Sequence, residues 1–275
     1  MSSFVRKSAL MSNPCDRRPL LVGGFAAMVL VGFLVAPGNL AWKTHVVLHG
    51  LCAQRPSHSL TIGGVTLPMD ARMTGIYLGA AVTILWLIAA RRHRATRVPS
   101  LPVLALLTSF VVALAVDGFN ALLVDLRFPT PYEPSNVLRM ASGILAGTSL
   151  GVALGHLFAS SMWAQGNRQR AVVTRPVELL TPISVSGAIA VLAFMDIPLL
   201  YGPFAVGLLV AAVAVFALLA QVVMALVTDR GWSCSTAADL APLAITSLAV
   251  AMVIIGGLSW LRFAAEQLLG LPKLT

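Results

Sequence analysis

Charge is scarce in this sequence. Only 11% of its 275 residues are charged, whereas 58% are hydrophobic. Soluble domains carry about a quarter charged residues, so the composition excludes an ordinary soluble domain. The few charges lie between apolar runs, and roughly 20 apolar residues in a helix cross a hydrocarbon core about 30 Å thick. The sequence therefore predicts an all-α, polytopic membrane protein.

Cysteine is also rare, with three residues in the chain. Cys15 and Cys234 fall on the side of the membrane that we predict to be cytoplasmic, and Cys52 falls on the other side. Cys52 therefore has no intramolecular disulfide partner, although it faces a compartment that would permit one.

Several enzyme signatures are missing. The chain has no His-Glu-x-x-His zinc motif, no Gly-x-Ser-x-Gly nucleophile motif and no glycine loop that would cradle phosphates. It also has no basic cluster interleaved with aromatic residues, which a groove for nucleic-acid strands would need. The net charge of +9 instead fits retention of Lys and Arg on the cytoplasmic side of a membrane. We expect the lipid bilayer, and no nucleic acid, as a partner.

Seven apolar stretches are long enough to be spans. We predict that they form one membrane domain over residues 1–275 and lie at 19–36, 72–90, 101–126, 138–160, 179–197, 203–227 and 238–262. The first stretch follows basic residues, as in a signal peptide, but its apolar run is longer than a usual signal core. We expect it to be retained as a span.

The basic residues predict the orientation. Twelve of the 19 Lys and Arg fall on the side that holds the N-terminus: Arg6, Lys7, Arg17, Arg18, Arg91, Arg92, Arg94, Arg97, Arg168, Arg170, Arg175 and Arg230. The positive-inside rule then places the chain in the cell (inner) membrane with a cytoplasmic N-terminus and an extracytoplasmic C-terminus.

Glycines recur at intervals of four in two predicted spans and form a glycine zipper. They are Gly75, Gly79, Gly143, Gly147, Gly151 and Gly155. A helix face without side chains lets another helix approach closely. We interpret these glycines as helix-packing positions, with a ligand-lined groove as the alternative.

The outer loop at residues 38–71 is long for a helix–helix connection. Its first half predicts a short interfacial helix over 39–52, and the segment 59–67 predicts a hairpin that turns at Gly63-Gly64. The loop contains candidate ligands for a transition metal: His45, His49, Cys52, His58 and Asp70. The first three lie at i, i+4 and i+7, on one face of the predicted helix. The alternative is a structural helix at the interface.

A second group of polar residues falls at similar depth near the outer side. It comprises Arg72, Tyr77, Asp117, Asn120, Asp125 and Arg139. A carboxylate inside a membrane is costly and suggests function. The cluster is predicted to be either a ligand pocket or an ion-pair network in which Asp117 pairs with Arg72 or Arg139. His156 near the inner end is interpreted as an interhelical hydrogen-bonding residue.

The segments 52–59 and 67–79 carry a resemblance. Ala71-Arg72, Thr74-Gly75-Ile76-Tyr77 and Gly79 fall in register with a motif of the domain-of-unknown-function 2085 family of prokaryotic membrane proteins. The resemblance covers roughly residues 45–155, including Asp117-Gly-Phe-Asn120. It implies a polytopic membrane protein and supplies no activity.

The chain departs from the family pattern at three positions. Ala53 replaces a His, and Asp70 and Met73 replace two Cys. If the family residues bind metal, this chain would have to use Cys52 and Asp70, with His49 or His58. The resemblance thus lowers the expectation of a metal here.

Three functions are open from the sequence. The first is a noncatalytic subunit or scaffold that associates with other membrane-protein subunits. The second is a small transporter or a lipid- or ligand-binding protein that uses the outer polar residues. The third, with the least support, is a membrane-embedded hydrolase or transferase with Asp117 and Asp70 as catalytic groups and His49 or His58 as acid–base residues.

Overall fold

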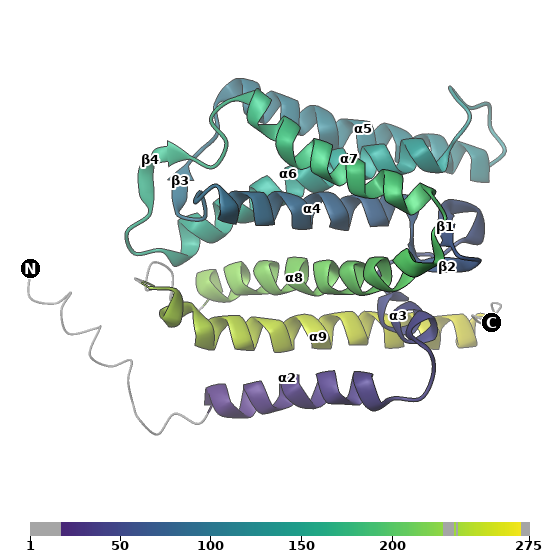
Figure 1. Cartoon of the computed structure of the whole chain (residues 1–275), viewed down its shortest axis with the longest axis horizontal. Coiled ribbons are helices and arrows are strands. Elements are labelled where there is room, and N and C mark those ends of the chain that lie inside the picture. Colours follow the sequence, from purple (N-terminus) through teal and green to yellow (C-terminus); the bar gives the residue numbers. More distant parts are fainter. Residues whose placement is uncertain (1–17, 228–233, 235, 271–275) are drawn as a thin grey trace, which may run out of the picture.

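Long helices run side by side, up and down, in one bundle (Figure 1). The computed structural model describes residues 18–227, 234 and 236–270. The long helices are α2 (Arg18–Val35), α4 (Ala71–Ala89), α5 (Leu101–Asp125), α6 (Asn136–Met162), α7 (Leu180–Phe194), α8 (Tyr201–Val227) and α9 (Ala237–Leu268). Several residues named in the sequence analysis for orientation and cysteine pairing lie outside the described residues: Arg6, Lys7, Cys15, Arg17 and Arg230.

Six of these helices are long and apolar enough to cross a membrane, within the part of the chain that is described. They correspond to the last six predicted spans, and α9 extends to Leu268 rather than stopping at residue 262. The predicted first span is present as α2, an 18-residue helix, of which Val22–Val35 is the apolar segment with described side chains. The structure therefore supports a polytopic helical bundle with six candidate spans.

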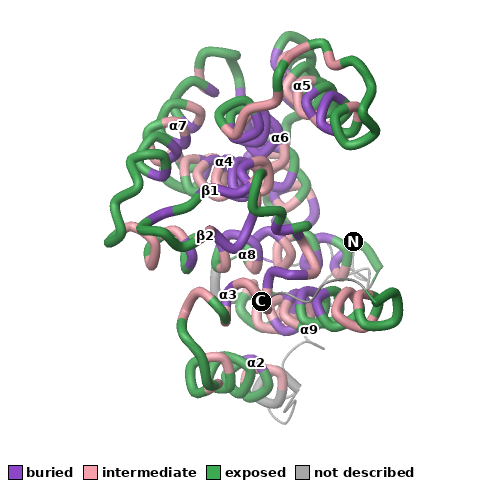
Figure 2. Tube along the Cα trace, turned by 90° about the vertical axis from the view of Figure 1, so that its right-hand side faces the viewer, coloured by how far each residue is buried: buried purple, intermediate pink, exposed green. Residues whose placement is uncertain are grey.

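The helices α4 and α6 form the centre of the bundle. Their contact is the most extensive between any two elements, and the predicted packing glycines lie in it. A Cβ added at Gly75 would meet the carbonyl oxygen of Met140, and one at Gly147 would meet the carbonyl oxygen of Ile76. Buried residues concentrate in this pair, whereas α2 is mostly exposed (Figure 2). Glycine is therefore required for the backbones to approach this closely.

Short elements cover the two ends of the bundle. At one end, which we call the hairpin end, lie α3 (Leu40–Leu48), η2 (Pro56–His58), η4 (Pro198–Leu200) and the antiparallel hairpin of β1 (Ser59–Ile62) and β2 (Val65–Asp70). The hairpin turns at Gly63 and Gly64, with φ of +61° and +77°, as predicted.

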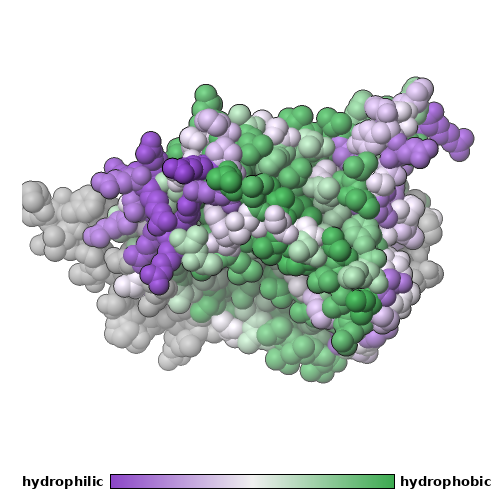
Figure 3. Space-filling view, turned by 45° about the horizontal axis from the view of Figure 1, so that its top comes forward, coloured by the Kyte–Doolittle hydropathy of each residue, from purple (hydrophilic) through white to green (hydrophobic). Residues whose placement is uncertain are grey.

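The opposite end, which we call the basic end, holds an element that the sequence did not predict. There β3 (Ala95–Arg97) pairs in parallel with β4 (Asn167–Ala171), and η3 (Pro176–Leu179) leads into α7. The pairing ties the α4–α5 connection to the α6–α7 connection. Hydrophilic side chains gather at both ends with a mainly hydrophobic surface between them (Figure 3), as expected for a protein whose middle faces lipid.

Candidate functional site

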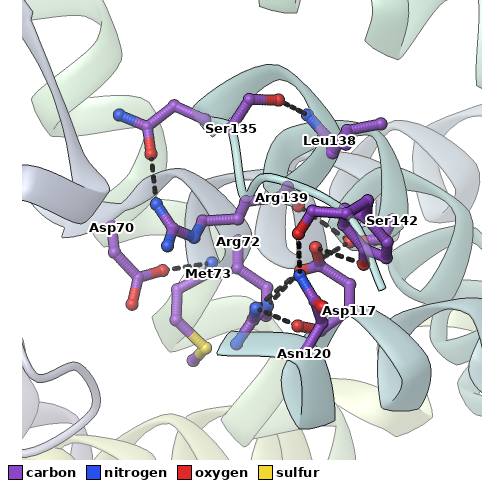
Figure 4. Close-up of polar contacts among 11 residues, drawn as sticks. Asp70, Arg72, Met73, Asp117, Asn120, Ser135, Leu138, Arg139 and Ser142 are labelled. Carbon is purple, nitrogen blue, oxygen red and sulfur yellow. Dashed lines mark hydrogen bonds and ion pairs between the residues drawn. The ribbon is translucent and has the colours of Figure 1, made fainter. Parts of the chain in front are cut away.

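A polar cluster lies at the hairpin end between α4, α5 and α6 (Figure 4). We call it the outer cluster; its members are Arg72, Asp117, Asn120, Tyr132, Asn136, Arg139 and Ser142. Arg72 lies in the first turn of α4, whose N-cap is Asp70. Asp117 and Asn120 lie one turn apart on α5, and Arg139 and Ser142 lie one turn apart on α6. Each pair therefore presents two side chains to one shared space.

Asp117 is the most connected side chain of the outer cluster. Its carboxylate accepts two hydrogen bonds from Arg72, at 3.0 Å from Nε and 2.5 Å from Nη2. Tyr132 donates to it over 3.2 Å and Ser142 over 3.4 Å. The Asp117 side chain is 4% exposed, and Arg72 neutralises its charge. The predicted ion pair thus forms with Arg72 and not with Arg139.

Arg139 and Asn120 are less well satisfied. The Arg139 residue is 7% exposed and donates to the Asn136 side chain over 2.9 Å, but its Nε has no hydrogen-bond partner. Within the described residues no carboxylate lies within salt-bridge distance of its guanidinium. Asn120 donates to the Tyr132 carbonyl over 3.0 Å, while its side-chain oxygen is buried without a partner. Buried groups in this condition are rare and costly.

Two predicted members lie outside the outer cluster. Tyr77 is 5% exposed and belongs to the apolar core with Leu48 and Ile62. Tyr77 lies five residues after Arg72. Its side chain therefore leaves α4 in a direction about 140° from that of Arg72, away from Asp117. Asp125 forms an exposed ion pair with Arg55 at 2.6 Å. Similar depth along the bundle was therefore not sufficient to bring these side chains together.

Tyr132, Ser142 and Asn136 were not predicted as members of the outer cluster. Ser142 follows Arg139 by one helical turn, a spacing that could have indicated its position. Tyr132 lies in the connection between α5 and α6, where no periodic pattern predicts the direction of a side chain. The pKa of Tyr132 is raised, first by burial and then by the negative charge of Asp117. The hydroxyl therefore keeps the proton that it donates to the Asp117 carboxylate.

The predicted metal face is wrong in its geometry. The helix α3 ends at Leu48, so Cys52 does not share a helical face with His45 and His49. Within the described residues no group of three His, Cys, Asp or Glu side chains could hold a metal ion. His45 contacts the Ala41 carbonyl over 2.9 Å, and Asp70 accepts a hydrogen bond from the Met73 amide over 2.7 Å. These side chains stabilise the local backbone.

Cys52 has a structural environment. It is 5% exposed, and its sulfur accepts hydrogen bonds from the backbone amides of Gln54 and Asp70. Burial, and then the charge of Asp70, raises the pKa of the thiol to about 11. Because the thiolate is the form that binds metals and attacks electrophiles, the thiol is unreactive near neutral pH.

His49 takes part in a contact that the sequence did not predict. Its ring nitrogens lie 2.9 Å from the Gln54 side chain and 2.8 Å from Glu266 near the end of α9, and its ring stacks on Phe263. Arg262 completes this set by bonding Glu266 over 2.8 Å and the carbonyl oxygen of His49. Only the i, i+4 spacing of Arg262 and Glu266 could have been noticed in the sequence. We call this group the His49–Glu266 contact.

Comparisons with known proteins agree with the resemblance found in the sequence. The family described as "Predicted membrane protein (DUF2085)" matches residues 52–154. An uncharacterized protein of Methanothermobacter thermautotrophicus is 36% identical over 104 residues, which cover 37% of this chain and 82% of that relative. No solved structure gives a significant match. The matched region runs from Cys52 through the outer cluster to α6, and on this similarity the chain belongs to the DUF2085 family of predicted membrane proteins.

Proposed function

We propose that the protein is a noncatalytic membrane subunit or scaffold. The observation that supports this function is that its carboxylates are occupied by the protein itself. The described residues include eight Asp and Glu side chains, and seven of these accept a hydrogen bond from another part of the chain. These seven are Asp70, Asp117, Asp125, Glu178, Asp196, Asp239 and Glu266. The eighth, Glu133, is an exposed side chain in the α5–α6 connection.

Acid–base catalysis needs a group that can reach a substrate and exchange a proton with it. Asp117 and Asp70, the candidate catalytic carboxylates, instead pin helices and cap α4. His49, a candidate acid–base residue, is 2% exposed with both ring nitrogens in contact with other side chains. These observations weigh against a hydrolase or transferase.

The outer helices leave surface for association with other membrane proteins. Most side chains of α5 face outward, including Val112, Val116 and Phe119, each at least half exposed. Such faces are suited to lipid or to another helix, whereas the glycine-packed centre is already occupied by α4 and α6.

Native mass spectrometry after gentle extraction from the source membrane tests the scaffold function. The expected result is a complex in which this chain has a fixed stoichiometry with other subunits. A single chain carrying lipid alone, under conditions that keep a known membrane complex intact, would contradict the proposal.

A second candidate function is supported by Arg139. A buried guanidinium without a carboxylate partner suits an anionic ligand such as a carboxylate or phosphate group. On this proposal, phosphate or acetate raises the melting temperature of the purified protein and of Arg127→Gln, but not of Arg139→Gln. Arg127 is an exposed arginine at the same end of the bundle. Equal responses in all three proteins, or no response in any of them, would exclude an anion site at Arg139.

A further inference from the structure

The basic end carries a dense group of exposed arginines. They lie on the α4–α5 connection, on β4 and before η3: Arg91, Arg94, Arg97, Arg168, Arg170 and Arg175. The hydrophilic surface that they form is at the left of Figure 3. Of these residues, Arg97, Arg168 and Arg170 lie on the paired strands β3 and β4, so the small sheet holds them together.

Three of these arginines, Arg97, Arg168 and Arg170, form no ion pair with any acidic side chain among the described residues. Among the described residues of the basic end, the acidic side chains are Glu178 and Asp239. Glu178 bonds Arg92 at 2.5 Å and 3.0 Å, and Asp239 accepts from the Thr236 amide at the start of α9. Such a surface attracts anions, and next to a membrane the abundant anions are lipid phosphates.

A groove opens on the bundle beside these arginines. It has a volume of about 630 Å³ and runs between α5 and α6, with Ile76 of α4 also in its lining. At its basic end it begins at Val98 and Pro99, directly after Arg97, and its lining is almost entirely apolar. His156 adds an imidazole to the wall.

The groove has the length of a lipid chain. Its α5 wall extends from Leu104 to Leu114, which is about 15 Å at 1.5 Å per residue. One leaflet of a hydrocarbon core about 30 Å thick has about the same depth. An apolar trough of one leaflet's depth therefore starts beneath a cluster of arginines.

We propose that this groove and the arginines beside it bind one anionic phospholipid. The acyl chain lies along α5 and α6, and the phosphate lies at Arg97, Arg168 and Arg170. Both parts of the lipid then find complementary surfaces, because the chain stays among apolar side chains and the headgroup meets the positive charge of these arginines. This site is at the opposite end from the outer cluster and is independent of whether the protein docks on other subunits.

Lipid retention tests the proposal. The full chain is stripped of lipid in detergent, reconstituted in nanodiscs with equal amounts of phosphatidylglycerol and phosphatidylcholine of identical chains, and released for native mass spectrometry. The wild type should retain phosphatidylglycerol in preference to phosphatidylcholine. Arg97→Gln, Arg168→Gln and Arg170→Gln should each lower that preference about fivefold, since a basic residue near a membrane surface contributes about 1 kcal/mol.

Two further variants make the test specific. Arg127→Gln removes an exposed arginine at the hairpin end and should keep the wild-type preference. Ala153→Phe fills the groove without changing charge and should lower retention of either lipid. Unaltered melting temperatures verify folding. Equal retention of both lipids by the wild type, equal effects of the Arg97 and Arg127 substitutions, or full retention by Ala153→Phe would each overturn the proposal.

Discussion

Asp117 illustrates how a single carboxylate is accommodated in an apolar bundle. The cost of burying a charge is recovered only when a countercharge and further donors satisfy it. Arg72 supplies the charge, and Tyr132 and Ser142 supply two more hydrogen bonds. Because these partners come from α4, α6 and the α5–α6 connection, one carboxylate links three helices at the hairpin end.

Asp117→Asn should destabilise the protein by about 3 kcal/mol, because it leaves the partly buried guanidinium of Arg72 without a countercharge. Thermal unfolding in detergent measures the loss.

Exchanging the charges, with Asp117→Arg and Arg72→Asp together, should recover part of the stability that is lost in Asp117→Arg alone. Asp125→Asn is the matched control, since the pair with Arg55 is exposed to solvent and contributes little to stability. Similar losses from both Asn variants would refute the structural role of Asp117.

The environment of His58 makes the stability of the protein depend on pH. Its pKa is lowered by burial first, and then by the charges of Arg139 and Arg55, against the opposing effect of Asp125 and Asp70. The unfolded chain therefore takes up the proton first as the pH falls below about 6.5, and stability present above that pH is lost below it. His58→Gln should lose less melting temperature than wild type between about pH 7.5 and about pH 5. Parallel curves would show that His58 makes no contribution.

At the scale of elements, glycine decides how helices approach one another. Gly50 is constrained in the same way as the zipper glycines, because a Cβ there would collide with the backbone of Ser259 on α9. Gly50 also donates its amide to the Ser259 hydroxyl over 3.0 Å. This contact with α9 lies just beyond the end of α3 at Leu48, and there the chain leaves the predicted helical path toward Cys52.

Gly147→Ala should destabilise the bundle by about 2 kcal/mol, because the new methyl group would overlap the carbonyl of Ile76 and force α4 and α6 apart. Gly187→Ala on α7 is the control, since nothing lies within 4 Å of a Cβ at that position. Alanine there should be neutral or stabilising by up to about 1 kcal/mol through helix propensity. Melting temperatures compare the two variants, and equal shifts would mean that close α4–α6 contact does not limit stability.

At the scale of the whole molecule, the distribution of arginine makes the two ends unlike. The predicted orientation, with the basic end cytoplasmic, remains a prediction. Glu133→Cys in the α5–α6 connection and Gln169→Cys on β4 lie at opposite ends of α6. In intact cells a membrane-impermeant thiol reagent should label Glu133→Cys, and should label Gln169→Cys only after permeabilisation. The reverse pattern would invert the topology, and labelling of both from one side would mean that α6 does not span the membrane.

Much of the architecture was predictable because it depends on local composition. The bounds of the α4, α5 and α8 spans, the turn at Gly63-Gly64 and the glycine face of α6 follow from hydropathy, glycine conformation and spacing within one element. The Thr236–Asp239 capping box is likewise a local pattern that the structure contains. Each of these features involves residues close together in the chain.

Hydropathy and spacing along the chain were enough to predict a helical membrane bundle with Arg72, Asp117 and Arg139 at similar depth. The folded bundle was needed to show that Asp117 pairs with Arg72, that Tyr77 lies in the core and that His49 contacts Glu266, 217 positions away. Periodicity describes which residues share a face of one helix. The rotation of each helix about its axis and the choice of its neighbours follow from packing across the bundle, and these set the partners of each polar side chain.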